Sequence, residues 1–126
     1  MAELSFGVYR PGDEKGIASL LRRCFFEFDR FGITPELWLE YPEIDRGFRR
    51  DLSFVARTEG RIVGHVQLVL REQRASGGVY IKVGGVANVC TDPEYRRRGI
   101  ATALLRMAHE AARREGCAYA CLFTGR

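Results

Sequence analysis

The chain has 126 residues, of which 46% are hydrophobic and 29% charged, and its formal net charge is +4. This length fits a single domain over residues 1–126 with a modest core. The first thirty residues carry charged side chains where a signal peptide needs an apolar block, and no stretch reaches the apolar length of a membrane span, so we expect a cytoplasmic protein with no membrane partner.

The N-terminal third predicts one strand and two helices. Residues 4–10 alternate with the period of a strand, and residues 11–28 follow with helical spacing. The apolar face of this helix is formed by Ile17, Leu20, Leu21, Cys24 and Phe28. Cys24 is therefore expected to be a small core residue. A second, less regular helix is expected within residues 35–50, where aromatic and acidic side chains interleave.

The middle of the chain predicts a β-hairpin followed by a loop. Residues 52–58 and 61–70 are both rich in β-formers, and Glu59-Gly60 between them has the composition of a tight turn. Residues 71–78 are polar and glycine-containing, so we expect an irregular loop there.

The C-terminal part predicts a strand, a helix and a second strand. Residues 79–91 predict a long strand, in which Gly84-Gly85 marks a bulge or a close backbone approach. Residues 98–115 predict the most regular helix, with Ile100, Leu104, Met107, Ala108 and Ala111 at core spacing. Residues 117–124 predict a buried strand.

These last three elements form a β-α-β unit over residues 79–124, whose outer strands should be parallel. With the earlier hairpin, the sequence predicts an α+β fold. Its mixed, mostly antiparallel sheet would be flanked by helices as a three-layer α/β sandwich.

The start of the long helix is predicted to bind an anion. Residues 96–126 hold seven arginines against two glutamates, whereas residues 1–95 hold 13 basic and 14 acidic side chains. The first-turn N–H groups of a helix have no partner within it, and with the helix dipole they favour a bound anion by up to about 2 kcal/mol. Gly99 and Ala101 leave room for phosphate oxygens. We therefore predict a diphosphate site. The candidates for its anionic partner are a nucleotide-like cofactor and a nucleic acid, and the alternative is that the arginines are simply solvated.

Two common diphosphate motifs are absent from the sequence. There is no GxxxxGK[ST], which argues against a P-loop nucleotide triphosphatase, and no GxGxxG followed by a ribose-binding acid, which argues against a dinucleotide fold.

The stretch "RRRGIA", residues 96–101, resembles the acyl-CoA signature of the GNAT superfamily of N-acetyltransferases, Q/R-x-x-G-x-G/A. Its context matches as well, since "VANVCTDPEY" precedes it and "TALL" follows. The resemblance covers nearly the whole chain and implies the GNAT fold. It also implies transfer of an acetyl group from acetyl-CoA to a primary amine by direct attack on the thioester, the amine belonging to a small molecule or a protein.

The resemblance implies a cofactor site in two parts. Backbone amides of residues 97–102 would bind the CoA pyrophosphate, and the backbone of residues 88–91 would pair with the pantetheine arm. An amide near Val89 or Cys90 would polarise the thioester carbonyl. The complete set implied is Asn88, Val89, Cys90, Thr91, Arg96, Arg97, Arg98, Gly99, Ile100, Ala101 and Thr102.

Candidates for the catalytic base are less specific. Glu43 and Asp45 are candidates because in the family the region between the first two helices shapes the acceptor site, although most acidic residues in such a region are solvated. His65 is opposite in phase to Val66 and Leu68. It is a candidate for the acceptor cleft, and we favour the alternative of a half-exposed strand histidine.

The four cysteines, Cys24, Cys90, Cys117 and Cys121, form no CxxC pair and no metal-ligand spacing, which predicts reduced thiols and no metal site. Cys90 would lie near the thioester by the resemblance. A covalent role would need an activating partner, and none is visible in the sequence, so we expect a strand side chain.

The resemblance also implies a further helix, which often carries a tyrosine acid, and a closing hairpin after the last strand. The sequence given stops at Arg126. We expect a fragment of a longer product, with elements supplied by another chain or a degenerate relative as alternatives. An apolar strand at a sheet edge also predicts association, for example as a homodimer.

Two rival functions of other classes remain. One is a non-catalytic acyl-CoA-binding module. The other is a nucleic-acid-binding protein that uses the arginine cluster, against which stands the lack of an aromatic stacking platform beside it.

Overall fold

The computed structural model describes residues 3–25 and 34–122. In chain order its elements are β1 (Ser5–Val8), α1 (Glu14–Cys24), α3 (Pro35–Ile44), β2 (Phe48–Thr58), β3 (Arg61–Arg74), a 3₁₀ turn (Ser76–Gly78), β4 (Tyr80–Thr91), a second 3₁₀ turn (Pro93–Tyr95), α4 (Ile100–Arg114) and β5 (Tyr119–Leu122). The strands form one sheet in the order β1-β2-β3-β4-β5. Neighbours are antiparallel except β4 and β5, which are parallel. The predicted α+β fold and its parallel β-α-β unit are confirmed.

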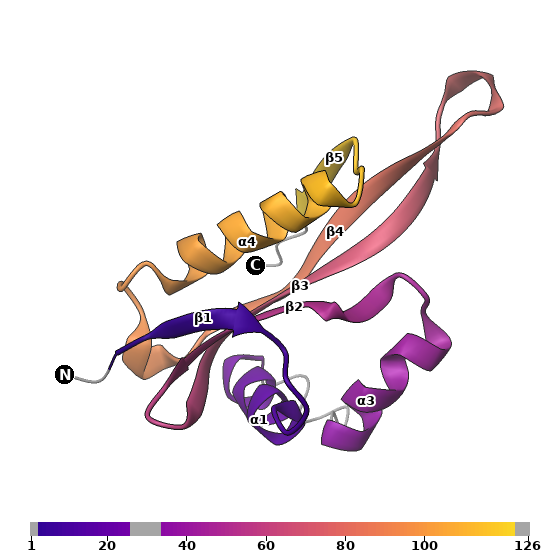
Figure 1. Ribbon diagram of the computed structural model, residues 1–126. Coiled ribbons are helices and arrows are strands. Elements are labelled where there is room, and N and C mark those ends of the chain that lie inside the picture. Colours follow the sequence, from indigo (N-terminus) through magenta and orange to yellow (C-terminus); the bar gives the residue numbers. More distant parts are fainter. Residues whose placement is uncertain (1–2, 26–33, 123–126) are drawn as a thin grey trace.

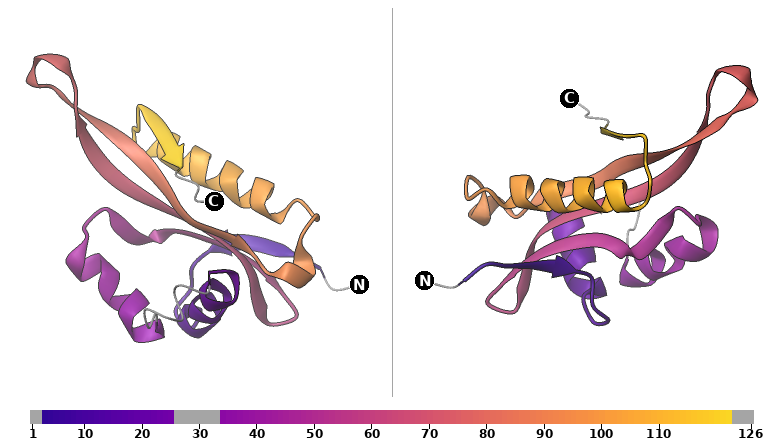
Figure 2. Two further views of the ribbon diagram at one scale, coloured as in Figure 1. Left: turned by 180° about the vertical axis from the view of Figure 1, so that it is seen from behind. Right: turned by 45° about the horizontal axis from the view of Figure 1, so that its top comes forward.

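The sheet separates two helical layers (Figure 1). Helix α4 covers one side, here called the α4 face, and helices α1 and α3 cover the other, here called the α1/α3 face; the view from behind shows the same division (Figure 2). Within residues 3–25 and 34–122, no helix is both long enough and apolar enough to cross a membrane.

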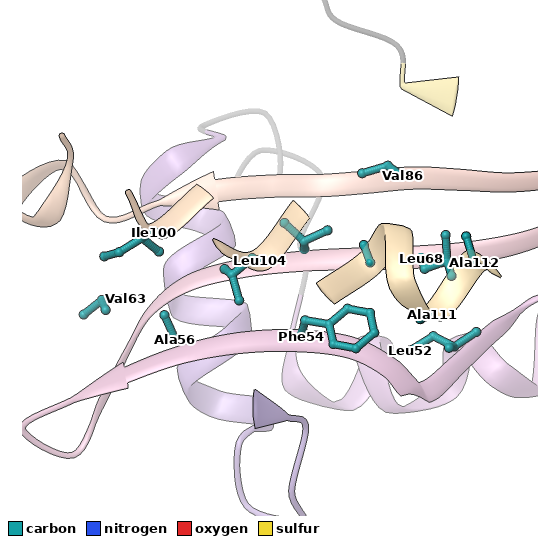
Figure 3. Packing of buried hydrophobic residues seen from close by; sticks show 12 residues of the cluster. Leu52, Phe54, Ala56, Val63, Leu68, Val86, Ile100, Leu104, Ala111 and Ala112 are labelled. Carbon is teal, nitrogen blue, oxygen red and sulfur yellow. The ribbon is translucent and has the colours of Figure 1, made fainter. Parts of the chain in front are cut away.

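The α4 face is closed by the amphipathic pattern of α4. Ile100, Leu104 and Ala108 are at most 2% exposed and pack on β2, β3 and β4 (Figure 3). Gly64 in β3 lets the helix approach, because a Cβ added there would lie 2.5 Å from Cγ2 of Ile100. The predicted helix is confirmed, although it begins at Ile100 rather than at residue 98.

The α1/α3 face is closed by a mixed aliphatic and aromatic cluster. Ile17 and Leu21 of α1 and Trp38 of α3 are fully buried and pack together with Phe48 of β2. Thr34 caps α3, its Oγ1 accepting from the Leu37 N–H at 3.1 Å.

Cys24, predicted to be a core residue, is partly buried against this cluster. Phe28, assigned to the same helical face, lies outside the described residues, as do the last two residues of the strand predicted over residues 117–124.

The hairpin between β2 and β3 is confirmed at the predicted turn. Thr58 pairs with Arg61, and Glu59 and Gly60 have φ values of 52° and 72°. Positive φ at both central residues is the requirement of a type I′ turn, whose twist matches that of the strands.

The loop predicted over residues 71–78 is wrong. Residues 71–74 extend β3 and pair with residues 80–83 of β4, so that only a short turn remains at Ser76–Gly78. This part of the hairpin projects beyond the helices (Figure 1). Its polar composition misled the prediction because a ribbon with solvent on both sides needs no apolar face.

Of the two alternatives predicted at Gly84-Gly85, a bulge or a close approach, the bulge is wrong. These two residues pair in register with Leu70 and Val69. The register shift lies instead between the pairs His65–Cys90 and Gln67–Ala87, where β4 has two residues opposite one. Gly84 is needed for close packing of a side chain, because a Cβ there would lie 2.8 Å from Cδ1 of Leu68.

Candidate functional site

A cavity of about 450 Å³ opens where β4 ends and α4 begins, and we call it the α4 cavity. Its wall is made of Cys24, Phe25, Val89, Cys90, Thr91, Tyr95, Arg96, Arg97, Gly99, Ile100, Ala101 and Thr102. Nine of the eleven predicted cofactor residues are therefore brought together. Asn88 and Arg98 are not part of the wall.

The helix start contributes backbone donors to the α4 cavity. Gly99 is the N-cap of α4 with a φ of 75°, a left-handed conformation that glycine adopts without strain, and a Cβ there would meet no atom within 4 Å. The Ala103 N–H donates to the Gly99 carbonyl at 3.0 Å. The N–H groups of residues 100–102 therefore precede the helical hydrogen-bond ladder and are the donors that an anion would use.

The arginines before the helix divide into two groups. Arg96 and Arg97 line the α4 cavity, and Nε of Arg96 donates to the Thr91 carbonyl at 3.4 Å. Arg98 instead places its guanidinium 5.1 Å from the centre of the Tyr95 ring, a cation–π contact.

The proline turn that leads into the helix is anchored by Asp92, which is 3% exposed. One carboxylate oxygen accepts from the Glu94 N–H at 3.0 Å, and the other accepts from Arg23 at 2.9 Å and from Arg61 at 3.4 Å. The Asp92 N–H donates to the Val63 carbonyl at 2.8 Å. This network holds the turn at Asp92 against α1 and β3.

A bulge deforms β4 beside the α4 cavity. Asn88 has a φ of 52°, and its carbonyl lies 3.0 Å from Nδ1 of His65. Because a carbonyl only accepts, Nδ1 is the protonated nitrogen, and Nε2 accepts from the Ser53 hydroxyl at 2.9 Å. His65 thus holds the bulge in place from the neighbouring strand.

A family model described as an acetyltransferase (GNAT) domain matches residues 8–124. The chain belongs to the GNAT family. GNAT domains are acyl-CoA-dependent N-acyltransferases, so acyl transfer from acyl-CoA to an amine is established as the class of reaction.

Solved structures share this fold. An acetyltransferase from Trypanosoma brucei is 24% identical with a TM-score of 0.76, over 98% of this chain and 84% of that one. A transcriptional regulator from Bacillus halodurans is 19% identical with a TM-score of 0.78, over 98% and 83%. The aminoglycoside N-acetyltransferase AAC(6')-Iy, solved in complex with CoA, is 17% identical with a TM-score of 0.75, over 99% and 79%. No curated protein matches the sequence.

His65 of this GNAT domain is fully buried, so the expectation of a half-exposed strand histidine is wrong. Its period-two position faces the α1/α3 side, and that side is covered by helices rather than by solvent. Burial lowers the pKa of His65 to about 4, which the hydrogen bond to the Asn88 carbonyl only partly offsets. The ring is therefore neutral near pH 7.

The two acidic candidates lie at the end of α3. Glu43 is exposed, and Asp45 ends the helix, with its carboxylate 2.6 Å from Nη2 of Arg71. The hydrogen bond from Arg71 lowers the pKa of Asp45. Gly64, seven residues from Arg71 along β3, pairs with Thr91 at the α4 cavity. Seven residues span roughly 23 Å at a rise of about 3.3 Å per residue. The ion pair of Asp45 and Arg71 therefore lies far along the sheet from the cavity.

Four residues at or beside the α4 cavity of this GNAT domain were not predicted as site residues: Arg23, Cys24, Phe25 and Tyr95. The first three come from the end of α1, 67 residues before Thr91 in the case of Cys24. No local sequence pattern records such a contact. An Asp-Pro pair such as residues 92–93 is typical of a capped turn, but no local pattern indicates that the Asp92 carboxylate is buried.

Proposed function

We propose that this GNAT domain transfers an acetyl group from acetyl-CoA to a primary amine, by direct attack of the amine on the thioester carbon. The observation that carries the proposal is the α4 cavity, in which the donor end of a helix meets a bulged strand end. We also propose a cytoplasmic location, because four free thiols suit a reducing compartment.

The helix end of the cavity fits a diphosphate. The N–H groups of residues 100–102 would donate to its oxygens, and Arg96 and Arg97 would add electrostatic attraction. The absence of a side chain at Gly99 allows the phosphates to approach the backbone. Arg98 is assigned a lesser part, because its guanidinium lies over Tyr95.

The strand end of the cavity fits the pantetheine arm. A bulge leaves one residue of the bulged strand without a partner across the ladder, and in β4 this falls at residues 88–89. Backbone groups released in this way can bind an extended ligand as an added strand would. An amide near Val89 or Cys90 would then polarise the thioester carbonyl, as an oxyanion donor does.

The amine must lose a proton before it attacks. An alkylammonium with a pKa near 10.4 requires about 4.6 kcal/mol to be neutral at pH 7. His65 has a low pKa and both of its ring nitrogens are hydrogen-bonded, and Asp45 is held in an ion pair. We therefore assign His65 to positioning the bulge, and propose that the proton leaves through water to the solvent rather than to a carboxylate of α3.

Calorimetry with acetyl-CoA on the Gly99→Asp variant tests the proposal. A carboxylate at the mouth of the helix start would repel the diphosphate, and we expect affinity to fall by about tenfold or more, which corresponds to about 1.4 kcal/mol. Gly99→Asn is the neutral control, because Asn has the same shape and tolerates left-handed φ. Gly116→Asp is the control for the added charge, because it places the same carboxylate at the other end of α4. Gly116 also has a positive φ, 80°, and a Cβ added there would meet no atom within 4 Å.

Equal acetyl-CoA affinity in Gly99→Asp and in the unchanged protein would reject this placement of the cofactor. Binding that is retained without acetyl transfer to any of a broad panel of amines would instead identify a non-catalytic acyl-CoA-binding module.

A further inference from the structure

Two cysteine thiols meet in the wall of the α4 cavity. Cys24 is the last residue of α1, Cys90 lies near the end of β4, and both line the cavity. Sγ of Cys24 lies 3.4 Å from the carbonyl oxygen of Thr91, the residue that follows Cys90, and Cys24 packs against the apolar cluster that contains Cys90. The mechanism proposed above uses neither thiol, so their pairing calls for its own explanation.

The two thiols differ in accessibility. Cys90 is 7% exposed, whereas Cys24 is partly exposed at the cavity wall. As a thiol, Cys24 donates to the Thr91 carbonyl at 3.4 Å; as a thiolate, it would accept from Cys90. Cys24 is therefore the sulfur that a reagent entering the cavity reaches first.

Electrostatics favour the same assignment. The hydrogen bond from Cys90, followed by the charges of Arg96 and Arg23, lowers the pKa of Cys24 to about 7 against burial and the Asp92 carboxylate. Interaction with the Cys24 side chain, followed by burial, raises the pKa of the Cys90 thiol. A thiolate is the nucleophile in thiol–disulfide exchange, so Cys24 is the attacking group and Cys90 the resolving one.

We propose that Cys24 and Cys90 form a reversible disulfide within the α4 cavity, with a small disulfide such as oxidised glutathione as the oxidant. In the first step the Cys24 thiolate attacks one glutathione sulfur, forms a mixed disulfide and releases a glutathione thiolate. In the second step Cys90 loses its proton to water and attacks the Cys24 sulfur, which releases the second glutathione. The protein loses two hydrogen atoms, and one oxidised glutathione becomes two reduced ones.

The bond would join the end of α1 to the end of β4. A disulfide fixes its two sulfur atoms about 2 Å apart, so its formation would draw the two elements together at the cavity wall. If acyl-CoA occupies this cavity, as proposed above, oxidation would weaken its binding. By linkage, bound acetyl-CoA would then protect the thiols from oxidation to the same degree.

The test exposes the purified protein, free of reductant, to oxidised glutathione and maps disulfides by mass spectrometry of peptides cut without reduction. We expect the Cys24–Cys90 peptide pair in the unchanged protein. Cys90→Ser should stop at a glutathione adduct on Cys24, and Cys24→Ser should leave residue 90 unmodified. The double variant Cys117→Ser/Cys121→Ser is the matched control, because it keeps the pair and removes the other two thiols, and it should oxidise as the unchanged protein does.

A mixed disulfide on Cys24 that persists in the unchanged protein, or modification confined to Cys117 and Cys121, would overturn the proposal. This readout needs no cofactor, so it stands even where acetyl-CoA binding fails. Calorimetry then addresses the consequence: oxidation of the control double variant should weaken acetyl-CoA binding at least about fivefold, and a thiol reductant should restore it.

Discussion

The two faces of the sheet differ in chemistry although the same strands build both. The α4 face buries one large cluster of hydrophobic side chains: Leu52, Phe54, Ala56, Val63, Val66, Leu68, Val86, Ile100, Leu104, Ala108, Ala111 and Ala112. The α1/α3 face receives Ser53, His65 and Gln67, which are all fully buried.

Polar groups on the α1/α3 face are only partly satisfied. The Arg50 guanidinium lies 3.9 Å from the centre of the Trp38 ring. Within residues 3–25 and 34–122, neither its two buried terminal nitrogens nor the buried Nε1 of Trp38 has a hydrogen-bond partner. Gln67 donates to the carbonyls of Arg49 and Leu68 at 3.0 and 3.1 Å, while its own side-chain oxygen has no partner in the part of the chain that the structure describes.

The comparison separates stability from function. Apolar contacts such as those of the α4 cluster contribute hydrophobic free energy without desolvating a polar group. The α1/α3 face holds the histidine that supports the bulge and the cysteine pair of the α4 cavity. The same face contains the polar atoms that lack hydrogen-bond partners in the described residues. Local departures from ideal packing are expected where a fold also performs chemistry.

The largest effect that would sharpen this contrast is expected for Leu104→Ala on the α4 face. Leu104 is fully buried in the cluster, so its truncation should lower the free energy of unfolding by about 2–5 kcal/mol. Arg106→Ala, an exposed change two residues further along the same helix, should stay within about 0.5 kcal/mol. Urea denaturation of both variants measures the difference; equal values for the two would show that this face is not the main core.

A pH-dependent effect is expected on the α1/α3 face. The pKa of His65 is 6.5 in its ordinary state and about 4 in the fold, so between these values the unfolded chain binds a proton that the folded chain does not. The free energy of unfolding should therefore be highest above pH 6.5 and fall as pH drops toward 4, by up to about 3 kcal/mol from this group.

His65→Gln removes the titrating ring and keeps a polar side chain at the position. The difference in unfolding free energy between the unchanged protein and this variant should shrink as the pH falls from 7 to 4. Parallel curves over that interval would mean that His65 has the same pKa in the folded and the unfolded protein.

The smallest effect is expected for Arg50→Met. The change removes a cation–π contact, but it also removes a buried guanidinium whose pKa is lowered by desolvation. These contributions oppose one another, so the midpoint of denaturation should correspond to a change of less than about 1 kcal/mol. A loss of 3 kcal/mol or more, measured in the same urea experiment, would assign Arg50 a partner in solution and contradict the contrast between the faces.

Local sequence patterns determined much of this protein. The spacing of Ile100, Leu104 and Ala108 defined α4 and its buried side, Glu59-Gly60 defined a hairpin turn, and the Arg-Gly pair at residues 98–99 marked the helix start that became one end of the cavity. Each of these depends on residues a few positions apart, where backbone preferences and side-chain periodicity act directly.

Only the tertiary structure decided the burial of His65, the position of the bulge at Asn88, and the meeting of Cys24 with Cys90. Nothing in the sequence pairs Cys90 with Cys24, which lies 66 residues earlier in the chain. Such features depend on which layers cover each side of the sheet and on how β3 and β4 align. Periodicity specifies that a side chain faces one side, whereas packing of distant elements decides whether that side is water, apolar core or a cavity.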